Sequence, residues 1–247
     1  YSSAASDVYK RQDHFYGNTV GEVDYFTHKR SGILDWQRNG EFIDEPGYYL
    51  DLIGDEAVKL IEHQDKDKPF LLYVASLAPH APYQAPKAME DRYAETIADP
   101  TRRTYAAMIT SLDEQVGRVV AALDQQGLRE NTLIVFASDN GGLQPGLMSS
   151  NGPFREGKGS LYEGGVRVPL LLRGPGVPAG ASFETPMSLV DLLPTLAALA
   201  GAPAPDALDG VSFDALLGAP EDRARASAPH TTAVSYTHLT LPTNREV

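Results

Sequence analysis

The sequence lacks several features that would define its class at once. It contains no cysteine, which excludes disulfide bonds and cysteine-based zinc sites and leaves the redox compartment open. Basic residues are scarce, and 21 Lys and Arg against 33 Asp and Glu give a formal net charge of -12. Phosphate groups require a basic surface, so this balance argues against a general nucleic-acid or anionic-membrane binder. No hydrophobic run approaches the roughly 20 residues that span a bilayer, so no transmembrane segment is predicted.

The two ends of the chain differ in character from its interior. The 247 residues, of which 42% are hydrophobic, are enough for one large folded domain, or for one domain with a small appendage. Residues 1–12 (YSSAASDVYKRQ) and 234–247 (VSYTHLTLPTNREV) lack the periodicity of the interior. We interpret both as adaptor-derived sequence of the kind found at the ends of metagenomic reading frames, with ordinary ragged termini as the alternative. The domain then occupies residues 13–233, and the sequence shows neither an initiating methionine nor a signal peptide.

Hydrophobic periodicity predicts alternating strands and helices. Continuous apolar runs predict buried strands at residues 70–76 (FLLYVAS), 132–137 and 168–172. Amphipathic spacing predicts a helix of about 14 residues from Tyr49, a long helix over residues 104–127, a helix over 188–200 and a short one over 213–217. Residues 36–47 have the polar composition of a surface loop or short hairpin. This order indicates an α/β fold with a mixed, largely parallel β-sheet flanked by helices.

A histidine is displayed directly after the first of these strands. His80 lies in the segment LAPHAPYQAP, where prolines at positions 79, 82 and 86 exclude regular structure. In open α/β sheets, ligands collect beyond the C-terminal ends of strands, which makes His80 a candidate site residue. A loop histidine that only hydrogen-bonds to its neighbours is the alternative.

An acid and an amide follow the second strand. Asp139 and Asn140 offer hard oxygen ligands that suit calcium or magnesium, and the two glycines after them allow a close approach of backbone to the site. The same Asp-Asn-Gly-Gly sequence is also good turn chemistry. Since this turn and His80 both follow strands, we expect them to converge.

Positive charge is concentrated in the loop after that turn. Arg155, Lys158 and Arg167 lie among glycines, and Lys158 has a glycine on each side. A lysine in this setting can reach an anion as a point charge without steric hindrance. A solvated basic loop is the alternative.

Four blocks of the chain, in this order, resemble the sulfatase family of the alkaline-phosphatase superfamily. The blocks are PFLLYVASLAPHAPYQAP, NTLIVFASDNGG, SNGPFREGKGSLYEGGVRVPLLLRGPG and SLVDLLPTLAALAG. The likeness is closest to the branch of arylsulfatase A, arylsulfatase B and N-acetylgalactosamine-sulfatase, and it extends from near Asp13 to near Ala219. It implies hydrolysis of sulfate esters by a formylglycine, made from Cys or Ser in a C/S-x-P-S/A-R motif, together with one calcium ion.

The resemblance also implies roles for particular residues. Asp139 and Asn140 correspond to calcium ligands, and Lys158 to the residue that binds the sulfate and its developing charge. His80 corresponds to a sulfate contact that helps to protonate the leaving oxygen. The expected partner is a sulfated small molecule or sulfated glycan, and the expected location is the periplasm or the cell exterior. The particular ester and the oligomeric state stay open.

The chain departs from the family pattern in its first half. It has no cysteine and no Ser-x-Pro-Ser/Ala-Arg motif, and it lacks the paired aspartates and the G-K-x-x-H block of the family. In the family these precede a segment that resembles DHFYGNTVGEVDYFTH. We therefore expect a sequence truncated at both ends, with most of the C-terminal subdomain missing, and an inactive chain.

Two alternatives to a sulfatase stay open. A phosphodiesterase or phosphonate hydrolase of the same superfamily would share the sheet, but such enzymes usually place Asp-His where this chain has Asp139 and Asn140. A non-catalytic binder of sulfated glycans would use Lys158 and His80 without chemistry. Upstream sequence discriminates between enzyme and binder, because a formylglycine motif there supports an enzyme.

Overall fold

The computed structural model describes residues 12–143, 149–183, 185–204 and 207–217. The chain divides into two compact units, Tyr1–Arg129 and Glu130–Val247, and each is described by itself. The segment 234–247 and all of the segment 1–12 except Gln12 lie outside the described residues. The prediction that these segments are foreign to the domain therefore stays a prediction.

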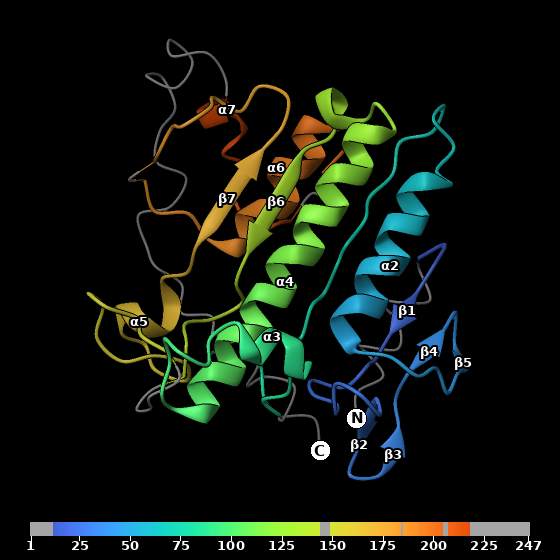
Figure 1. The fold of residues 1–247 in the computed structure, drawn as a ribbon. Helices are drawn as coiled ribbons and strands as arrows, with labels where there is room; N and C mark the ends of the chain where they lie inside the picture. Colours follow the sequence, from blue (N-terminus) through green and yellow to red (C-terminus); the bar gives the residue numbers. More distant parts are fainter. Residues whose placement is uncertain (1–11, 144–148, 184, 205–206, 218–247) are drawn as a thin grey trace, which may run out of the picture. The chain divides into compact units, whose positions relative to one another are not determined.

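The first unit combines short antiparallel strands with helices (Figure 1). Its elements are β1 (Tyr16–Gly17), β2 (Lys29–Arg30), β3 (Ile33–Leu34), β4 (Gln37–Arg38), β5 (Glu41–Phe42), α2 (Tyr49–Glu62), α3 (Lys87–Asp91) and α4 (Pro100–Gln125). Strand β4 pairs with β1 and β5, and β2 pairs with β3. The β4–β5 pair confirms the hairpin predicted within residues 36–47.

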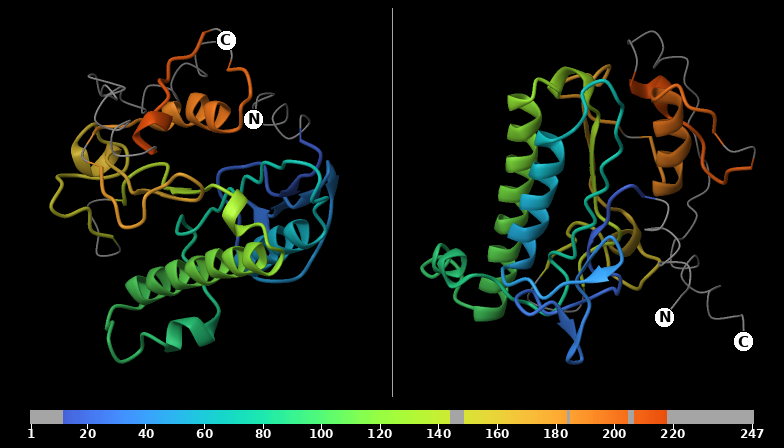
Figure 2. Two further views of the ribbon diagram at one scale, coloured as in Figure 1. Left: turned by 90° about the horizontal axis from the view of Figure 1, so that it is seen from above. Right: turned by 90° about the vertical axis from the view of Figure 1, so that its right-hand side faces the viewer.

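Helices α2 and α4 lie side by side in every view (Figures 1 and 2). They approach closely at Gly54 of α2, where a Cβ atom would lie 2.0 Å from Oε1 of Gln115. Nε2 of Gln115 in turn donates a hydrogen bond to Oδ1 of Asp51 at 3.0 Å. Helix α4 begins earlier than predicted because Asp99 caps it, accepting a hydrogen bond from the backbone N–H of Arg102 at 2.7 Å, and Pro100 suits its first turn.

The buried face of α4 differs from the predicted apolar stripe. Its buried residues are Ala107, Met108, Ser111, Gln115, Ala122 and Leu123. Ile109, one of the apolar residues at helical spacing that predict this helix, is 43% exposed. Small and polar side chains occupy the buried face because a neighbouring helix approaches there, which the hydrophobic pattern of one helix cannot reveal.

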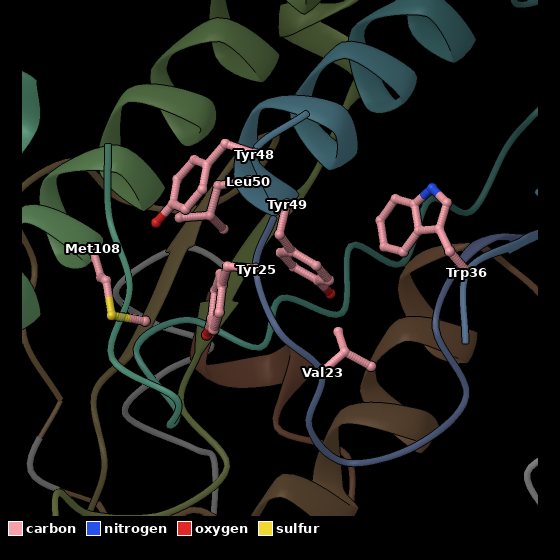
Figure 3. Packing of buried hydrophobic residues seen from close by; sticks show 7 residues of the cluster. All are labelled: Val23, Tyr25, Trp36, Tyr48, Tyr49, Leu50 and Met108. Atoms are coloured by element: carbon pink, nitrogen blue, oxygen red, sulfur yellow. The ribbon is translucent and has the colours of Figure 1, made fainter. Parts of the chain in front are cut away.

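An aromatic core holds the first unit together (Figure 3). Its buried residues are Val23, Tyr25, Trp36, Tyr48, Tyr49, Leu50 and Met108. The ring of Tyr49 meets those of Tyr25 and Trp36 edge-on, with centroid distances of 5.3 and 5.4 Å. Burial raises the pKa of Tyr25 and Tyr49 far above the ordinary value, so both phenols stay neutral. Trp36 was predicted within a surface loop and is instead fully buried, because it packs between other rings.

Residues 70–76 are not the buried strand that the sequence predicts. The structure assigns no strand there, and Leu71 and Tyr73 are 87% and 75% exposed. A continuous apolar run indicates a segment suited to burial on both faces, but a strand also needs hydrogen-bonding neighbours. Within the described part of the first unit, no strand pairs with this segment.

The second unit contains a pair of strands and short helices. Its elements are β6 (Ile134–Ala137), α5 (Glu163–Val166), β7 (Leu170–Arg173), η2 (Leu189–Asp191), α6 (Leu192–Leu199) and α7 (Asp214–Leu217), preceded by η1 (Arg129–Asn131) at the junction of the units. Strands β6 and β7 confirm two predicted strands and form one ribbon (Figure 1). Apolar residues of β7, including Leu170 and Leu172, pack against Phe213, Leu216 and Leu217.

The strand pairings correct one detail of the predicted sheet. Strand β6 runs antiparallel to β7, with Ile134 opposite Arg173 and Ala137 opposite Leu170. Every strand pair within the described residues is antiparallel, whereas the prediction was a mixed, largely parallel sheet. In the described residues of the connection, 138–143 and 149–169, α5 is a helix of four residues and no full crossover helix is present, which agrees with the reversed direction of β7.

The predicted helix over residues 188–200 consists of η2 followed by α6. Ser188 is the N-cap of η2, and Asp191 is the third residue of a capping box, in which its Oδ2 accepts a hydrogen bond from the backbone N–H of Ser188 at 2.8 Å. Its Oδ1 accepts from the backbone N–H of Val211 at 2.9 Å. Asp191 is fully buried and thereby ties the start of α6 to the segment before α7.

Candidate active site

The turn after β6 presents the predicted acid and amide. The hydroxyl of Ser138 donates to the backbone carbonyl of Asn140 at 2.9 Å and so bends the chain away from the strand. Asp139 is exposed and Asn140 is half-buried. Nδ2 of Asn140 donates to Oδ1 of Asp139 at 2.9 Å, so the two side chains lie next to each other.

Glycines pack this turn against α5. The backbone N–H of Gly141 donates to the carbonyl of Gly165 at 3.0 Å. A Cβ atom on Gly141 would lie 1.7 Å from the carbonyl oxygen of Gly164, a distance that no side chain tolerates. The turn that carries Asp139 and Asn140 is therefore held directly against the segment 163–166.

Backbone contacts also connect this turn with Lys158. The N–H of Lys158 donates to the carbonyl oxygen of Gly142 at 3.0 Å. The side-chain amide of Asn151 bonds to the backbone of both Gly142 and Glu156. Sequence reasoning did not single out Asn151. The Asn-Gly pair at positions 151 and 152 indicated a turn there, but nothing in the sequence indicated partners nine residues away.

The structure distinguishes Lys158 from the two arginines of the same loop. Arg155 lies 4.1 Å above the ring of Tyr162 and 3.7 Å from a carboxylate oxygen of Glu156. Arg167 pairs with Glu163 at 3.3 Å and lies 4.8 Å above the ring of Phe154. Lys158 is exposed, and no carboxylate of the described residues pairs with its ammonium group. Lys158 is thus the cation of this loop that is open to an incoming anion.

His80 lies in the first unit, in the proline-rich loop where the sequence predicts it. Its backbone N–H donates to the carbonyl of Leu77 at 2.7 Å, and its own carbonyl accepts from the hydroxyl of the buried Tyr25 at 3.0 Å. Nδ1 of the ring lies 2.8 Å from the carbonyl oxygen of Ala81, which requires a proton on Nδ1. Nε2 is then the atom that accepts a proton in the neutral ring and donates one in the imidazolium form.

The loop of His80 is anchored through Gln84 and Asp24. Oε1 of Gln84 accepts from the backbone N–H of Tyr25 at 2.8 Å, and its Nε2 donates to Asp24 at 2.6 Å. Burial alone would raise the pKa of Asp24, but hydrogen bonds from Gln84 and from the backbone of Thr27 and Phe26 lower it to about 2. The ionised carboxylate is therefore part of this anchor.

This anchor predicts an acid-dependent loss of stability. Because the folded pKa of Asp24, about 2, lies below its ordinary value of 3.8, its contribution is fully present above pH 3.8 and is lost as the pH falls towards 2. We expect the free energy of unfolding to fall less steeply over this window in Asp24→Asn than in the wild type. Urea unfolding followed by circular dichroism at several pH values measures this, and equal slopes in the two proteins would contradict it.

The side-chain oxygens of the turn are of the type that binds a hard cation. Asp139 and Asn140 provide oxygen ligands of the type that calcium prefers, and calcium takes roughly six to eight of them. Within the described residues, no group of three or more His, Cys, Asp or Glu side chains is arranged to hold a metal ion. The turn thus offers two of the oxygen ligands that a calcium ion would need, and the remaining oxygens would have to come from water, substrate or other groups.

The structure brings three of the four predicted site residues into one assembly. Asp139, Asn140 and Lys158 belong to the second unit, where the carbonyl of Gly142 links the turn to the lysine. His80 belongs to the first unit. Its convergence with the other three stays a prediction.

Comparison with known proteins identifies the family of this chain. A sequence profile of the sulfatase family matches residues 2–202, and the chain belongs to this family. It is 38% identical over 213 residues to a sulfatase of Formosa agariphila, which covers 76% of this chain and 36% of that protein. It is 40% identical over 162 residues to arylsulfatase A of Homo sapiens, which covers 64% of this chain and 30% of that protein. N-acetylgalactosamine-6-sulfatase of Homo sapiens is 33% identical over 193 residues, which covers 72% of this chain and 36% of that protein.

Solved structures agree with this assignment. The crystal structure of Ps i-CgsB in complex with k-i-k-neocarrahexaose is 38% identical and superimposes with a TM-score of 0.76, covering 81% of this chain and 49% of that chain. The resemblance to sulfatases and the α/β fold of the alkaline-phosphatase type are confirmed. The chain spans about a third of the length of the curated relatives it matches. None of the described helices is long and apolar enough to cross a membrane.

Proposed function

We propose that this chain carries part of the active site of a sulfuric ester hydrolase that acts on a sulfated glycan. One observation carries the proposal. Lys158 is exposed, its ammonium group pairs with no carboxylate of the described residues, and its backbone is bonded directly to the turn of Asp139 and Asn140. A cation whose backbone is bonded to a turn with two hard oxygen ligands is suited to a sulfate group next to a divalent ion.

The proposed roles follow from the chemistry of each group. Asp139 and Asn140 would hold calcium, which when bound supplies positive charge to the sulfate oxygens. Lys158 offsets the charge of the transferring sulfate as a point charge. In the imidazolium form, His80 keeps its Nδ1 proton on the carbonyl of Ala81 and donates the Nε2 proton to the leaving oxygen.

The nucleophile is the missing part of this site. The sequence has no cysteine and no Ser-x-Pro-Ser/Ala-Arg motif, so formylglycine cannot form within these 247 residues. We propose that the chain is a fragment of a sulfatase whose formylglycine belongs to another part of the protein. A periplasmic or secreted location is part of the same proposal and rests on the family alone.

Two findings support a sulfated glycan as the substrate class. N-acetylgalactosamine-6-sulfatase, by its name, acts on a sulfated sugar and is 33% identical to this chain. The structure of Ps i-CgsB, 38% identical, was solved with an oligosaccharide named k-i-k-neocarrahexaose. The curated relatives named above are all sulfatases, and the pair Asp139 and Asn140 replaces the Asp-His pair of phosphodiesterases, so the diesterase alternative has less support.

Titration calorimetry with a sulfated hexasaccharide and its chemically desulfated form tests this proposal. In the presence of calcium, the sulfated form should bind at least tenfold more tightly than the desulfated form. Its sulfate is the group that Lys158 and the calcium at the turn of Asp139 and Asn140 would bind. Equal affinities for the two forms would contradict the proposal. A diester of phosphate that binds more tightly than the sulfated sugar would favour the diesterase alternative.

A further inference from the structure

The side chain of Asn151 holds Gly142, in the turn proposed to bind the metal, through both of that residue's backbone polar groups. Its Oδ1 accepts from the backbone N–H of Gly142 at 2.9 Å, and its Nδ2 donates to the carbonyl oxygen of the same Gly142 at 2.9 Å. Both polar groups of one residue are therefore held by one amide. Such a two-point contact fixes the orientation of Gly142 as well as its distance.

The same amide reaches the loop that carries Lys158. Nδ2 of Asn151 also donates to the carbonyl oxygen of Glu156 at 3.0 Å. Glu156 has a φ of 61°, a left-handed conformation that is costly for a residue with a Cβ atom. A strained residue keeps such a conformation only where surrounding contacts hold it, and the bond from Asn151 is one of these contacts.

The two contacts of Asn151 enclose the link between the turn and the lysine. The carbonyl of Gly142 accepts from Asn151 and also from the backbone N–H of Lys158 at 3.0 Å. Gly142 follows Asn140 by two residues, and Glu156 precedes Lys158 by two residues. Asn151 is thus bonded on both sides of the path that joins the proposed calcium ligands to the proposed sulfate contact.

We propose that Asn151 is a positioning residue that sets the separation between the calcium turn and Lys158, and so couples calcium binding to sulfate binding. This inference rests on the proposed function of the same site. Asn151 itself touches neither ligand. It acts through the backbone of Gly142 and Glu156. Its loss would therefore keep the calcium turn and Lys158 but would no longer fix the distance between them.

Amide hydrogen exchange tests the clamp without reference to any ligand. In Asn151→Ala, exchange at the N–H groups of Gly142 and Lys158 should quicken at least tenfold, because the first loses its acceptor and the second bonds to a carbonyl that is no longer held. The N–H of Gly141, bonded to Gly165, should keep its rate. Unchanged exchange at Gly142 and Lys158 would overturn the proposal.

A binding cycle tests the coupling. The affinity for a sulfated hexasaccharide is measured with and without calcium in the wild type, in Asn151→Ala and in Ser150→Ala, a matched control whose hydroxyl contacts only the nearby backbone N–H of Gly152 among the bonds described. We expect calcium to strengthen sulfate binding in the wild type and in Ser150→Ala. In Asn151→Ala the calcium effect should shrink at least fivefold, while calcium alone binds within threefold of the wild type.

The outcomes separate this inference from the proposed function. A wild type that binds neither calcium nor the sulfated sugar overturns both. A wild type with coupled binding and an Asn151→Ala variant with the same coupling overturns this inference alone. If Asn151→Ala does not fold, Asn151→Asp serves in its place. Aspartate keeps the oxygen that accepts from the N–H of Gly142 but cannot donate to the carbonyls of Gly142 and Glu156. Undiminished coupling in this variant also overturns the inference.

Discussion

The 247-residue chain is expected to release no product from an aryl sulfate, with or without calcium. The reason is the absence of a nucleophile precursor, since the sequence has no cysteine and no Ser-x-Pro-Ser/Ala-Arg motif. A covalent nucleophile divides one difficult displacement into two easier ones, and the other groups of a site cannot replace it. The measurement is nitrophenol release from nitrophenyl sulfate at micromolar protein, compared with buffer.

The control for this experiment is a sulfatase with an intact formylglycine motif under the same conditions, which should turn the substrate over. Trace contamination is excluded by assaying Lys158→Ala purified in parallel. Turnover by the wild-type chain that disappears in this variant would show that the chain catalyses the reaction itself, and would contradict the account. Turnover that persists equally in the variant comes from a contaminant and leaves the chain without activity of its own, as expected.

Replacing Lys158 with alanine is expected to weaken binding of a sulfated hexasaccharide by about tenfold to a hundredfold. Hydrogen bonds to charged groups contribute about 1.5–3 kcal/mol, and each 1.4 kcal/mol corresponds to a factor of about ten in affinity. The structure places no competing carboxylate of the described residues on this ammonium group, so its full charge is available to the ligand. Titration calorimetry in the presence of calcium measures the change.

Arg167→Ala is the matched control for Lys158→Ala. It removes the same charge from the same loop, but Arg167 is already paired with Glu163 and lies over the ring of Phe154. Affinity should therefore fall less than threefold. Raised salt should weaken binding to the wild type more than to Lys158→Ala. Equal losses in the two variants would mean that the loop attracts the ligand by its overall charge, and would contradict a specific contact at Lys158.

Local sequence signals predicted much of the fold. Helix α2, the strands β6 and β7 and the short helix α7 lie where periodicity placed them, because each is encoded by its own residues. The pairing of the strands could not be predicted from these local signals. The direction of β7 relative to β6 depends on the path of the long connection between Ala137 and Leu170, and no residue of either strand encodes that path. Residues 70–76 have the composition of a buried strand, but a strand is defined by neighbours as well as by composition.

The residue types of the candidate site could be predicted from the sequence, but the contacts that hold those residues in place could not. Residue type alone identifies two features of the site in the sequence, the pair Asp139 and Asn140 and the glycine-flanked Lys158. The flanking glycines already favour Lys158 over Arg155 and Arg167, and the three-dimensional contacts with Tyr162, Glu163 and Phe154 add that both arginines are engaged within the loop. The sequence did not indicate Asn151 because this residue bonds to backbone atoms, which are the same in every residue type.

Calcium titration of the wild type and Asp139→Ala, with Asp113→Ala as the control, tests the central claim most directly. Asp113 is an exposed carboxylate on α4, and its replacement changes the net charge equally. The account predicts that Asp139→Ala weakens calcium binding at least tenfold and removes the calcium-dependent part of sulfated-hexasaccharide binding, while Asp113→Ala changes neither. Calcium binding and calcium-dependent sugar binding that survive unchanged in Asp139→Ala would contradict it.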